Sequence, residues 1–523
     1  MNAFTPSVAT ARPLTAPLLL LLGLVAVGVT LMGLSAVLGG ATISPLADPM
    51  GWLAGLDADS LADTAEVVAA VLAVAVTVVA IVVDLAANRY SHEITRLFLR
   101  EPVNIIVLGL FAITTLMLIW VATMLGESAP DALVPNAGFA LALGLVTLCL
   151  LLLIPYVFFV FAFLSPISVI GRICRDAYKV ILRARHGNLP RSQARVEEAI
   201  DELQDVARSA ISQGDRGIAM AGVDTLAGLV SDYVRIRHRL PEGWFAITAK
   251  VAADADFIAL SPETMEEVES QGIWVERKVF RRYLSLMGQC AVHQRDVANL
   301  IGINTQRIAC EFGAGHPHLL ELCVRSFNSY LRTTINLKDP RTAYFLMNQY
   351  RIIAERMLAD GKQGVAVKIA GYLSFYGQWA HTMGISFLLE TAAYDIMQLI
   401  EYALEHQPDA VDPLLTCLLE LDQVIKEESQ EQSLLGVRRC QMQLATRFLA
   451  HGDEARAQRI VDDLRTERLE RLERLRDGLL SDERAQFWEL SDRGVNFSYL
   501  DPERRPYLEP LFQRLREPTP ALV

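Results

Sequence analysis

The chain has 523 residues, of which 52% are hydrophobic, and a formal net charge of -12. Its mean hydropathy of +0.29 is too high for an ordinary soluble protein. The negative charge argues against a nucleic-acid partner, because proteins that bind nucleic acids usually carry a basic surface. Apolar residues crowd positions 1–170 and charged residues crowd the remainder, which predicts a membrane domain followed by a large globular domain.

Four apolar runs are long enough to cross a hydrocarbon core about 30 Å thick: 14–37, 67–83, 104–125 and 137–165. A cleaved signal peptide is the alternative for the first run. Its apolar region would span only about 7–15 residues, so an uncleaved span is favoured. Pro155 in the fourth run predicts a kink or a tilted, extended helix.

The stretch 84–101, DLAANRYSHEITRLFLRE, joins the second and third runs. Read as a helix, it places Tyr90, Ile94, Leu97 and Phe98 on one face, with charged residues around the rest. A basic amphipathic segment between two spans belongs at the cytoplasmic lipid surface.

The link between the first and second runs and the link between the third and fourth contain no basic residue, whereas the 84–101 link contains three arginines and further basic residues follow the fourth run. The positive-inside rule therefore predicts that both termini and the globular domain are cytoplasmic. These cations should contact anionic lipid headgroups, at about 1 kcal/mol each. They are Arg89, Arg96, Arg100, Arg172, Arg175, Lys179, Arg183 and Arg185.

Small residues repeat every four positions along the second run, at Ala65, Ala69, Ala73 and Thr77. Such a stripe allows close approach of helix backbones, either inside one four-helix bundle or between copies in a homo-oligomer. Asp84 ends the same run. It is interpreted as a solvated carboxylate or a partner of Arg89, and the sharper alternative is an ion or proton site.

The junction at 84–101 resembles the hallmark of an uncharacterised family of bacterial predicted membrane proteins, a domain of unknown function. In that family a valine-rich span runs into Q-L-A-S-S-Q-[YF]-S-P-R and then a basic stretch ending F-L-x-D. The matching positions here are Leu85, Ala86, Tyr90, Ser91, Phe98 and Leu99. Glu101 replaces the final Asp, and Asp84, Arg89, His92 and Glu93 also depart from the pattern.

A second resemblance lies further along the chain. Ile335-Asn336, Asp339-Pro340 and Thr342-Ala343 are similar to the family's I-N-D-P-x-T-A turn, with two residues inserted. The resemblance implies a multi-pass protein of the bacterial inner membrane with a cytoplasmic domain. It implies no catalytic residue, because the family has no settled activity.

From about residue 191 onward, helical periodicity is nearly continuous and strand signals are scarce. The predicted fold class is all-α: a four-helix transmembrane domain (1–170), a basic linker (171–190), a helical cytoplasmic domain (191–430) and a C-terminal helical region (431–523). Helices are expected at 196–211, 217–238, 274–311, 317–334, 341–359, 363–377, 384–406 and 411–427. A bundle and a solenoid both fit this pattern.

Two turns share the pattern R-x-x-I-x-x-x-D-x-x-x-A, with the acid at Asp215 and at Asp339. An Asp at this point predicts a helix N-cap. Their similarity hints at a duplicated helical unit, with chance as the alternative. Residues 444–464 resemble a tetratricopeptide-type hairpin, and residues 465–480 form an amphipathic helix that is solvated or, less simply, in a coiled coil.

Chemical motifs are scarce. The chain has no P-loop, GxGxxG, HExxH or GxSxG motif, so no catalytic residue and no cofactor are assigned. His316 and His318, flanked by Cys310 and Cys323, could bind zinc, but buried structural cysteines are the simpler interpretation, so no metal is assigned. The seven cysteines are expected to be reduced, and the four tryptophans beyond residue 190, spread singly, are expected in the core.

Three functions remain open. The leading hypothesis is a membrane-anchored scaffold or sensor that binds protein partners through its cytoplasmic helices. The alternative is an oligomeric channel or pore, suggested by the small-residue stripe and by hydroxyls at Thr77, Thr114, Thr115 and Thr123. A membrane enzyme comes third.

Overall fold

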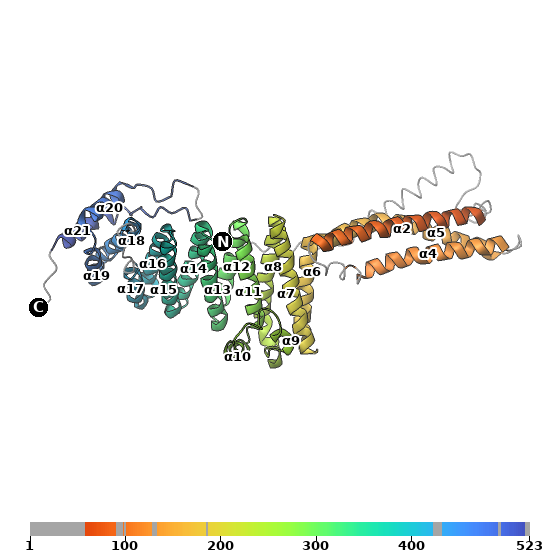
Figure 1. The fold of residues 1–523 in the computed structure, drawn as a ribbon, viewed down its shortest axis with the longest axis horizontal. Coiled ribbons are helices and arrows are strands. Elements are labelled where there is room, and N and C mark those ends of the chain that lie inside the picture. The colour runs from red at the N-terminus through yellow and green to blue at the C-terminus, as the bar shows by residue number, and fades with distance from the viewer. Residues whose placement is uncertain are drawn as a thin grey trace. The chain divides into compact units, whose positions relative to one another are not determined.

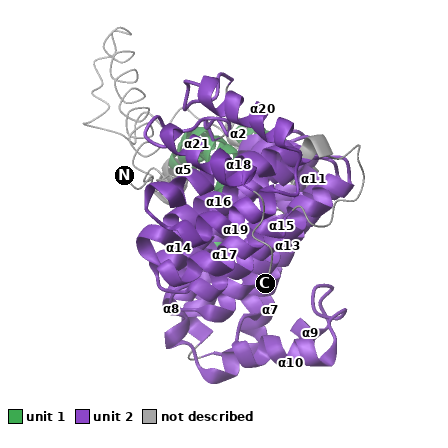
Figure 2. Cartoon of the chain, turned by 90° about the vertical axis from the view of Figure 1, so that its left-hand side faces the viewer, with its two compact units in different colours: residues 1–175 green, residues 176–523 purple. Residues whose placement is uncertain are grey.

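A computed structural model of the chain describes residues 58–89, 98, 101–127, 133–184, 187–421, 431–489 and 493–517. Within these ranges the secondary structure is helical, without strands, apart from an isolated β-bridge between Gln486 and Val495. The expected all-α fold is confirmed. The chain divides into two compact units, residues 1–175 and 176–523, coloured green and purple in Figure 2.

The first unit contains three long apolar helices: α2 (Ala58–Arg89), α4 (Pro102–Glu127) and α5 (Leu133–Leu164). Each has a stretch that is long and apolar enough to cross a membrane. α2 packs along α4, and α4 packs along α5. The candidate spans are Glu66–Leu85, Pro102–Trp120 and Gly144–Leu164.

Three of the predicted spans therefore correspond to helices of spanning length. The first, residues 14–37, lies outside the described residues, so the four-span layout stays a prediction. The same holds for residues 90–97, 99 and 100 of the junction. α4 begins at Pro102, where the fixed φ of proline suits the first helical position and its missing N–H costs no hydrogen bond.

The contact between α4 and α5 buries polar atoms. Thr114 and Cys149 are fully buried, and their Oγ1 and Sγ atoms lie 3.3 Å apart. Thr114 Oγ1 also lies 2.7 Å from the carbonyl oxygen of Leu110 one turn earlier. Lipid tails offer no hydrogen bonds, so a hydroxyl in a span must find its partner within protein.

Helix α6 (Pro166–Arg183) follows α5 after Ser165 and is amphipathic rather than uniformly apolar. Its basic residues and Asp176 alternate along the sequence with apolar residues that form one face of the helix. The buried side chains of this face recur at intervals of three and four residues, the period of an α-helix. They are Val169, Ile170, Ile173, Ala177 and Ile181.

In the second unit, the long helices from α7 to α16 pair into hairpins that form two layers, α17 and α18 extend the two layers, and each helix packs on the next helix of its own layer. Figure 1 shows α7, α8 and α11 to α18 following one another in order. The first layer is α7 (Leu189–Ser212), α11 (Trp274–Cys290), α13 (Pro317–Asn336), α15 (Gln363–Thr382) and α17 (Val411–Leu419). The second layer is α8 (Arg216–Ile236), α12 (Arg295–Phe312), α14 (Pro340–Ala359), α16 (Phe387–His406) and α18 (Glu431–Ala450).

Shorter elements complete the unit. α19 (Glu454–Leu464) pairs with α18, and α21 packs on both. Because each hairpin contacts its neighbours along the chain, the packing is that of a solenoid rather than a bundle. The remaining helices are α9 (Ala249–Ala252), α10 (Pro262–Gln271), α20 (Leu469–Ser481), α21 (Leu508–Arg516) and the 3-10 turns Arg237–Arg239, Glu242–Trp244, Pro408–Ala410 and Arg505–Tyr507.

The two similar turns have the same local structure, and both predicted N-caps are confirmed. The side chain of Asp215 accepts a hydrogen bond from the N–H of Ile218, and that of Asp339 accepts one from the N–H of Thr342. The residue before each acid has a positive φ, 76° at Gly214 and 54° at Lys338. Three other hairpins turn through a positive-φ glycine with the same backbone hydrogen bonds, so the similarity follows from hairpin geometry. Duplication stays a prediction.

Most expected helix boundaries agree with the structure to within a few residues, and two expectations are wrong. The helix expected at 411–427 ends at Leu419. The stretch 274–311 forms two helices, because the helix ends at Cys290 and a new one begins at Arg295. The hairpin expected at 444–464 is α18 and α19, joined at Gly452-Asp453. An internal boundary near residue 430 stays a prediction, since residues 422–430 are not described.

Candidate functional site

The second unit contains a groove between α13 and α15, of about 650 Å³, that is lined by polar as well as aromatic residues. These helices are neighbours in the first layer but touch over a shorter stretch than the helices before them do. Polar, basic and aromatic side chains and one glycine line the groove. They are Asn328, Ser329 and Arg332 from α13 and Lys368, Gly371, Tyr372, Phe375 and Tyr376 from α15. We call this the basic aromatic groove.

Arg332 supplies the cation of this groove. Its side chain is exposed, and the guanidinium carbon lies 4.5 Å from the centroid of the Trp379 ring. Among the described residues no carboxylate lies within ion-pair distance of Arg332. Stacking on an aromatic face holds a guanidinium in place while its N–H groups remain available to an anion.

Lys368 is in a different state. Its Nζ lies 3.0 Å from both carboxylate oxygens of Glu321. Burial alone would raise the pKa of Glu321, but hydrogen bonds from Lys368 and Arg325 outweigh it and hold that pKa below its usual value. An incoming anion therefore meets one available cation, Arg332, beside a neutralised pair.

An aromatic cluster forms one wall of the groove. Phe375 is 48% exposed and makes edge-on contacts with Tyr376 and Trp379, with ring centroids 5.2 and 5.7 Å away. Tyr376 in turn stacks on Trp379 at 6.2 Å. Burial raises the pKa of Tyr376, and Arg332 opposes that rise. The hydroxyl therefore stays protonated at neutral pH and can donate a hydrogen bond.

Residues beneath the groove are packed tightly. Tyr350 from α14 donates a hydrogen bond to Asn328 Oδ1 at 3.1 Å and stacks on Phe327 at 5.0 Å. A Cβ added at Gly371 would meet no atom within 4 Å, so that position opens onto free space. The lining contains no His, Cys, Asp or Glu, so it suits binding of an anionic and apolar group rather than acid–base chemistry.

A buried ion network is the other large polar cluster in the unit. The fully buried ammonium of Lys278 lies 2.9 Å from Asp254, 3.1 Å from Asp201 and 3.5 Å from Glu197. Arg282 adds contacts to Asp201 and to Asp256 at 2.7 and 3.0 Å. Burial raises the pKa of Glu197 to about 7, against the attraction of Lys278. Lys278 and Arg282 each contact several acids and share Asp201 and Asp254, so the network fixes α7, α11 and the loop at 254–256 to one another.

The comparisons with known proteins concern the N-terminal part of the chain. Residues 13–224 match the family of predicted membrane proteins DUF2254. The match covers all the expected spans and ends inside α8. No curated protein and no solved structure matches the chain.

The match confirms the resemblance that the junction at 84–101 suggested, and it indicates a membrane protein of unknown function with apolar helices long enough to cross a membrane. The second resemblance, at 335–343, lies beyond the DUF2254 region, as does the basic aromatic groove. The family therefore says nothing about the groove.

Inside the DUF2254 region, the small-residue stripe lies partly on the surface of the described helices. Ala69 is half-buried, whereas Ala73 and Thr77 are exposed, and Thr77 Oγ1 donates to the carbonyl of Ala73 at 2.7 Å. The side chain of Ala65 is not described. Asp84 is exposed near the end of α2. The packing, pore and ion-site interpretations stay predictions.

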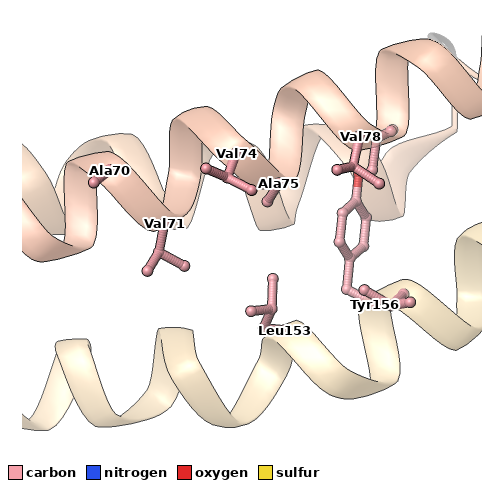
Figure 3. Close-up of a pocket in the computed structure, with 9 residues that line it drawn as sticks. Ala70, Val71, Val74, Ala75, Val78, Leu153 and Tyr156 are labelled. Carbon is pink, nitrogen blue, oxygen red and sulfur yellow. The ribbon is translucent and has the colours of Figure 1, made fainter.

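The other face of α2 contributes to an apolar groove of about 420 Å³ facing α5. Figure 3 shows Val71 and Val74 opposite Leu153, with the ring of Tyr156 directed toward Val78. Such a surface suits lipid tails or another apolar helix.

Four of the predicted membrane-surface cations lie on α6. The guanidinium of Arg172 stacks over the Phe163 ring at 3.4 Å, and Arg175 donates to the carbonyl of Gly171. Lys179 is 62% exposed and 3.3 Å from Asp176, and Arg183 ends the helix. Arg96, Arg100 and Arg185 lie outside the described residues, as does the side chain of Arg89. Lipid contact stays a prediction.

The ligand-like cluster of histidines and cysteines is not gathered into a site. Within the described ranges no group of three His, Cys, Asp or Glu residues could hold a metal. Burial raises the pKa of both Cys310 and Cys323, which keeps the thiols protonated. None of the seven cysteines forms a disulfide.

The tryptophans differ from one another. Trp244 and Trp274 are fully buried and form a pair with ring centroids 5.6 Å apart, as core residues. Trp488 is 71% exposed, so the expectation of a core position is wrong there. Trp379 is half-buried and supports Arg332. The sequence signal for the groove was the aromatic series 372, 375, 376 and 379 on one helix, which sequence analysis passed over.

Proposed function

We propose that the protein is a membrane-anchored scaffold or sensor whose cytoplasmic helical domain binds a partner protein in the basic aromatic groove. The observation that carries this proposal is the state of Arg332. It is exposed, held over Trp379 and without an ion pair in the described chain, beside a half-exposed Phe375. An exposed cation beside exposed aromatic surface offers a charged contact and an apolar contact side by side, the kinds of residue that carry most binding energy in protein interfaces.

The groove suits an extended segment that carries an acidic side chain next to an apolar one. A guanidinium pairs with a carboxylate through two parallel hydrogen bonds, and Phe375 and Tyr372 offer apolar surface beside it. Solenoids bind extended partners along the surfaces that their stacked repeats form.

The test uses the full-length protein in lipid nanodiscs and fluorescent peptides that carry Asp or Glu beside Phe or Leu. Arg332→Ala is expected to weaken the best peptide at least tenfold, and Gly371→Phe is expected to block it by filling the open space. Arg307→Ala, an exposed arginine on α12, is the control and should leave binding unchanged. Peptide binding that survives both groove variants would remove the proposal.

The proposed setting is the bacterial inner membrane, with both termini in the cytoplasm and the cations of α6 and of the 2–3 link near anionic headgroups. The distribution of basic residues supports it. Reporter fusions after residues 57 and 523 test it, because the two positions are expected on opposite sides. A signal from the same side at both positions would contradict the topology.

One observation favours a second candidate, an oligomeric channel. Ala73 and Thr77 are exposed on α2, so the stripe is open to α2 of another copy. Bilayer recordings on the reconstituted protein would decide: currents abolished by Ala73→Leu but not by Ala80→Leu would favour the channel. Absence of currents together with peptide binding in the groove would favour the scaffold.

A further inference from the structure

The C-terminal part of the second unit contains a segment that has no α-helix and ends in the 3-10 turn Arg505–Tyr507, and it crosses the second layer. We call residues 493–507 the strap. Its side chains contact α14, α16 and α18, which lie in the layer that does not form the basic aromatic groove. The strap therefore marks a second surface, independent of the proposed function.

An arginine anchors the strap. Arg493 is 3% exposed, and both of its terminal nitrogens donate to the carboxylate of Asp395, with Nη2 3.1 Å from Oδ2. Nη2 also donates to the carbonyl of Tyr344 at 2.8 Å, and the guanidinium lies 4.2 Å from the Tyr344 ring centroid. Asp395 is fully buried, and its other neighbour is Arg351 at 3.3 Å.

An aromatic residue follows four positions later. The ring of Phe497 stacks on Tyr394 with centroids 4.1 Å apart, and Phe387 and Tyr344 complete its surroundings at 6.4 Å. Gln443 Nε2 from α18 donates to the backbone carbonyls of Phe497 and Tyr499, at 3.1 and 2.9 Å.

The strap is bound to these helices through side chains. In the described chain, no backbone–backbone hydrogen bond joins residues 493–507 to α14, α16 or α18. Three contacts of the strap are those of a peptide in a docking groove. An arginine pairs with a buried carboxylate, an aromatic ring stacks on another ring, and a side-chain amide donates hydrogen bonds to the carbonyls of an extended backbone. They do not depend on covalent connection to the helices.

We infer that the face formed by α14, α16 and α18 is a docking site for a partner segment that carries an arginine and, four residues later, an aromatic residue. The strap occupies this site in cis and competes with the partner. Asp395 recognises the arginine, the ring of Tyr394 recognises the aromatic residue, and Gln443 selects an extended backbone. Glu401, which pairs with Arg504 of the strap, extends the acidic face.

The test uses a fluorescent peptide with the sequence of residues 493–507 and the full-length protein in nanodiscs. Arg493→Ala/Phe497→Ala weakens the strap and should bind the peptide at least tenfold more tightly than the wild-type protein does. Peptides lacking the arginine or the phenylalanine should each lose at least tenfold. These peptide controls need no further change in the protein. Arg332→Ala should leave this binding unchanged, which separates the two surfaces.

Hydrogen exchange on the wild-type protein gives a second readout that depends on no variant. If the site exchanges ligands, amides of 493–500 should exchange faster than those of α16, because the strap leaves while the helices stay folded. Equal amide exchange rates in the strap and in α16 would show that the strap is a fixed part of the core and would overturn the inference. Failure of the folded double variant to bind the peptide would overturn it as well.

Discussion

The ammonium of Lys278 lies 2.9 Å from the carboxylate of Asp254, and no part of the Lys278 side chain is exposed. A buried charge is tolerated only when its neighbours neutralise it, and here three carboxylates share that task. This relationship fixes the loop between α9 and α10 to helices α7 and α11, and it gives the first two predictions.

Lys278→Met should destabilise the second unit by about 3–5 kcal/mol, because it leaves several buried carboxylates without their cation. Arg281→Met is the matched control. Arg281 is 44% exposed and 3.8 Å from Asp256, so its loss should cost less than about 1 kcal/mol. Urea unfolding followed by circular dichroism measures both. Equal losses of stability for the two variants would mean that the burial of Lys278 does not make its ion pairs more important than an exposed one.

The stability of the unit should fall as pH rises from about 4.5 to 7. Glu197 has a pKa of about 7 in the folded chain and 4.5 ordinarily, mainly because of burial. Between these values the unfolded chain releases a proton that the folded chain retains, so rising pH favours unfolding. Glu276, buried beside Arg237, acts with the same sign.

Glu197→Gln should remove part of this slope, on the order of 2–3 kcal/mol across the window. Thermal unfolding at pH 5 and pH 8 measures it. Glu198→Gln, at an exposed neighbour that pairs with Arg195, should keep the wild-type slope. A flat wild-type profile would contradict the assignment.

Lys338→Gly should stabilise the unit by about 1 kcal/mol. Lys338 has a φ of 54°, a conformation that costs a residue with a Cβ about 1–2 kcal/mol. Glycine removes that cost, but it also raises the conformational entropy of the unfolded chain, which offsets part of the gain in stability. Leu337→Gly is the control: its φ of -77° gains nothing from glycine, so stability should fall. The midpoint of urea unfolding separates the two, and a rise for both would point to another cause.

Two glycines of α15 should respond oppositely to alanine. A Cβ at Gly377 would lie 2.7 Å from the Cβ of Ala392 on α16, so Gly377→Ala should force the helices apart and cost about 1–3 kcal/mol. Gly371→Ala meets open space and should gain about 0.5–1 kcal/mol from helix propensity. Thermal unfolding of the two variants checks the difference in sign.

Periodicity was enough to predict the helices because their pattern is local. Charge-free runs marked the spans, and Asp215 and Asp339 marked helix starts, since an N-cap needs only the residues beside it. The break at 291–294 carries no glycine or proline. It depends on a distant contact, the hydrogen bond from Gln294 Nε2 to the carbonyl of Ile211 at 2.7 Å, which no local pattern reveals.

Neither of the two proposed binding surfaces could be derived from the sequence, for a similar reason. Arg332 and Trp379 are on different helices, and Arg493 meets Asp395 across 98 positions of chain. The stacking of hairpins decides which arginine has no acidic partner and which is buried against one. The aromatic spacing on α15 was visible, but its exposure was not.

The strap also has a mechanical consequence. In a stack where each hairpin touches only its neighbours, successive hairpins can melt one at a time. Residues 493–507 bridge α14, α16 and α18, so three successive hairpins are tied together and should give way as one cooperative block. Release of that tie would soften this end of the stack while leaving the hairpins of α7 to α12 as they are.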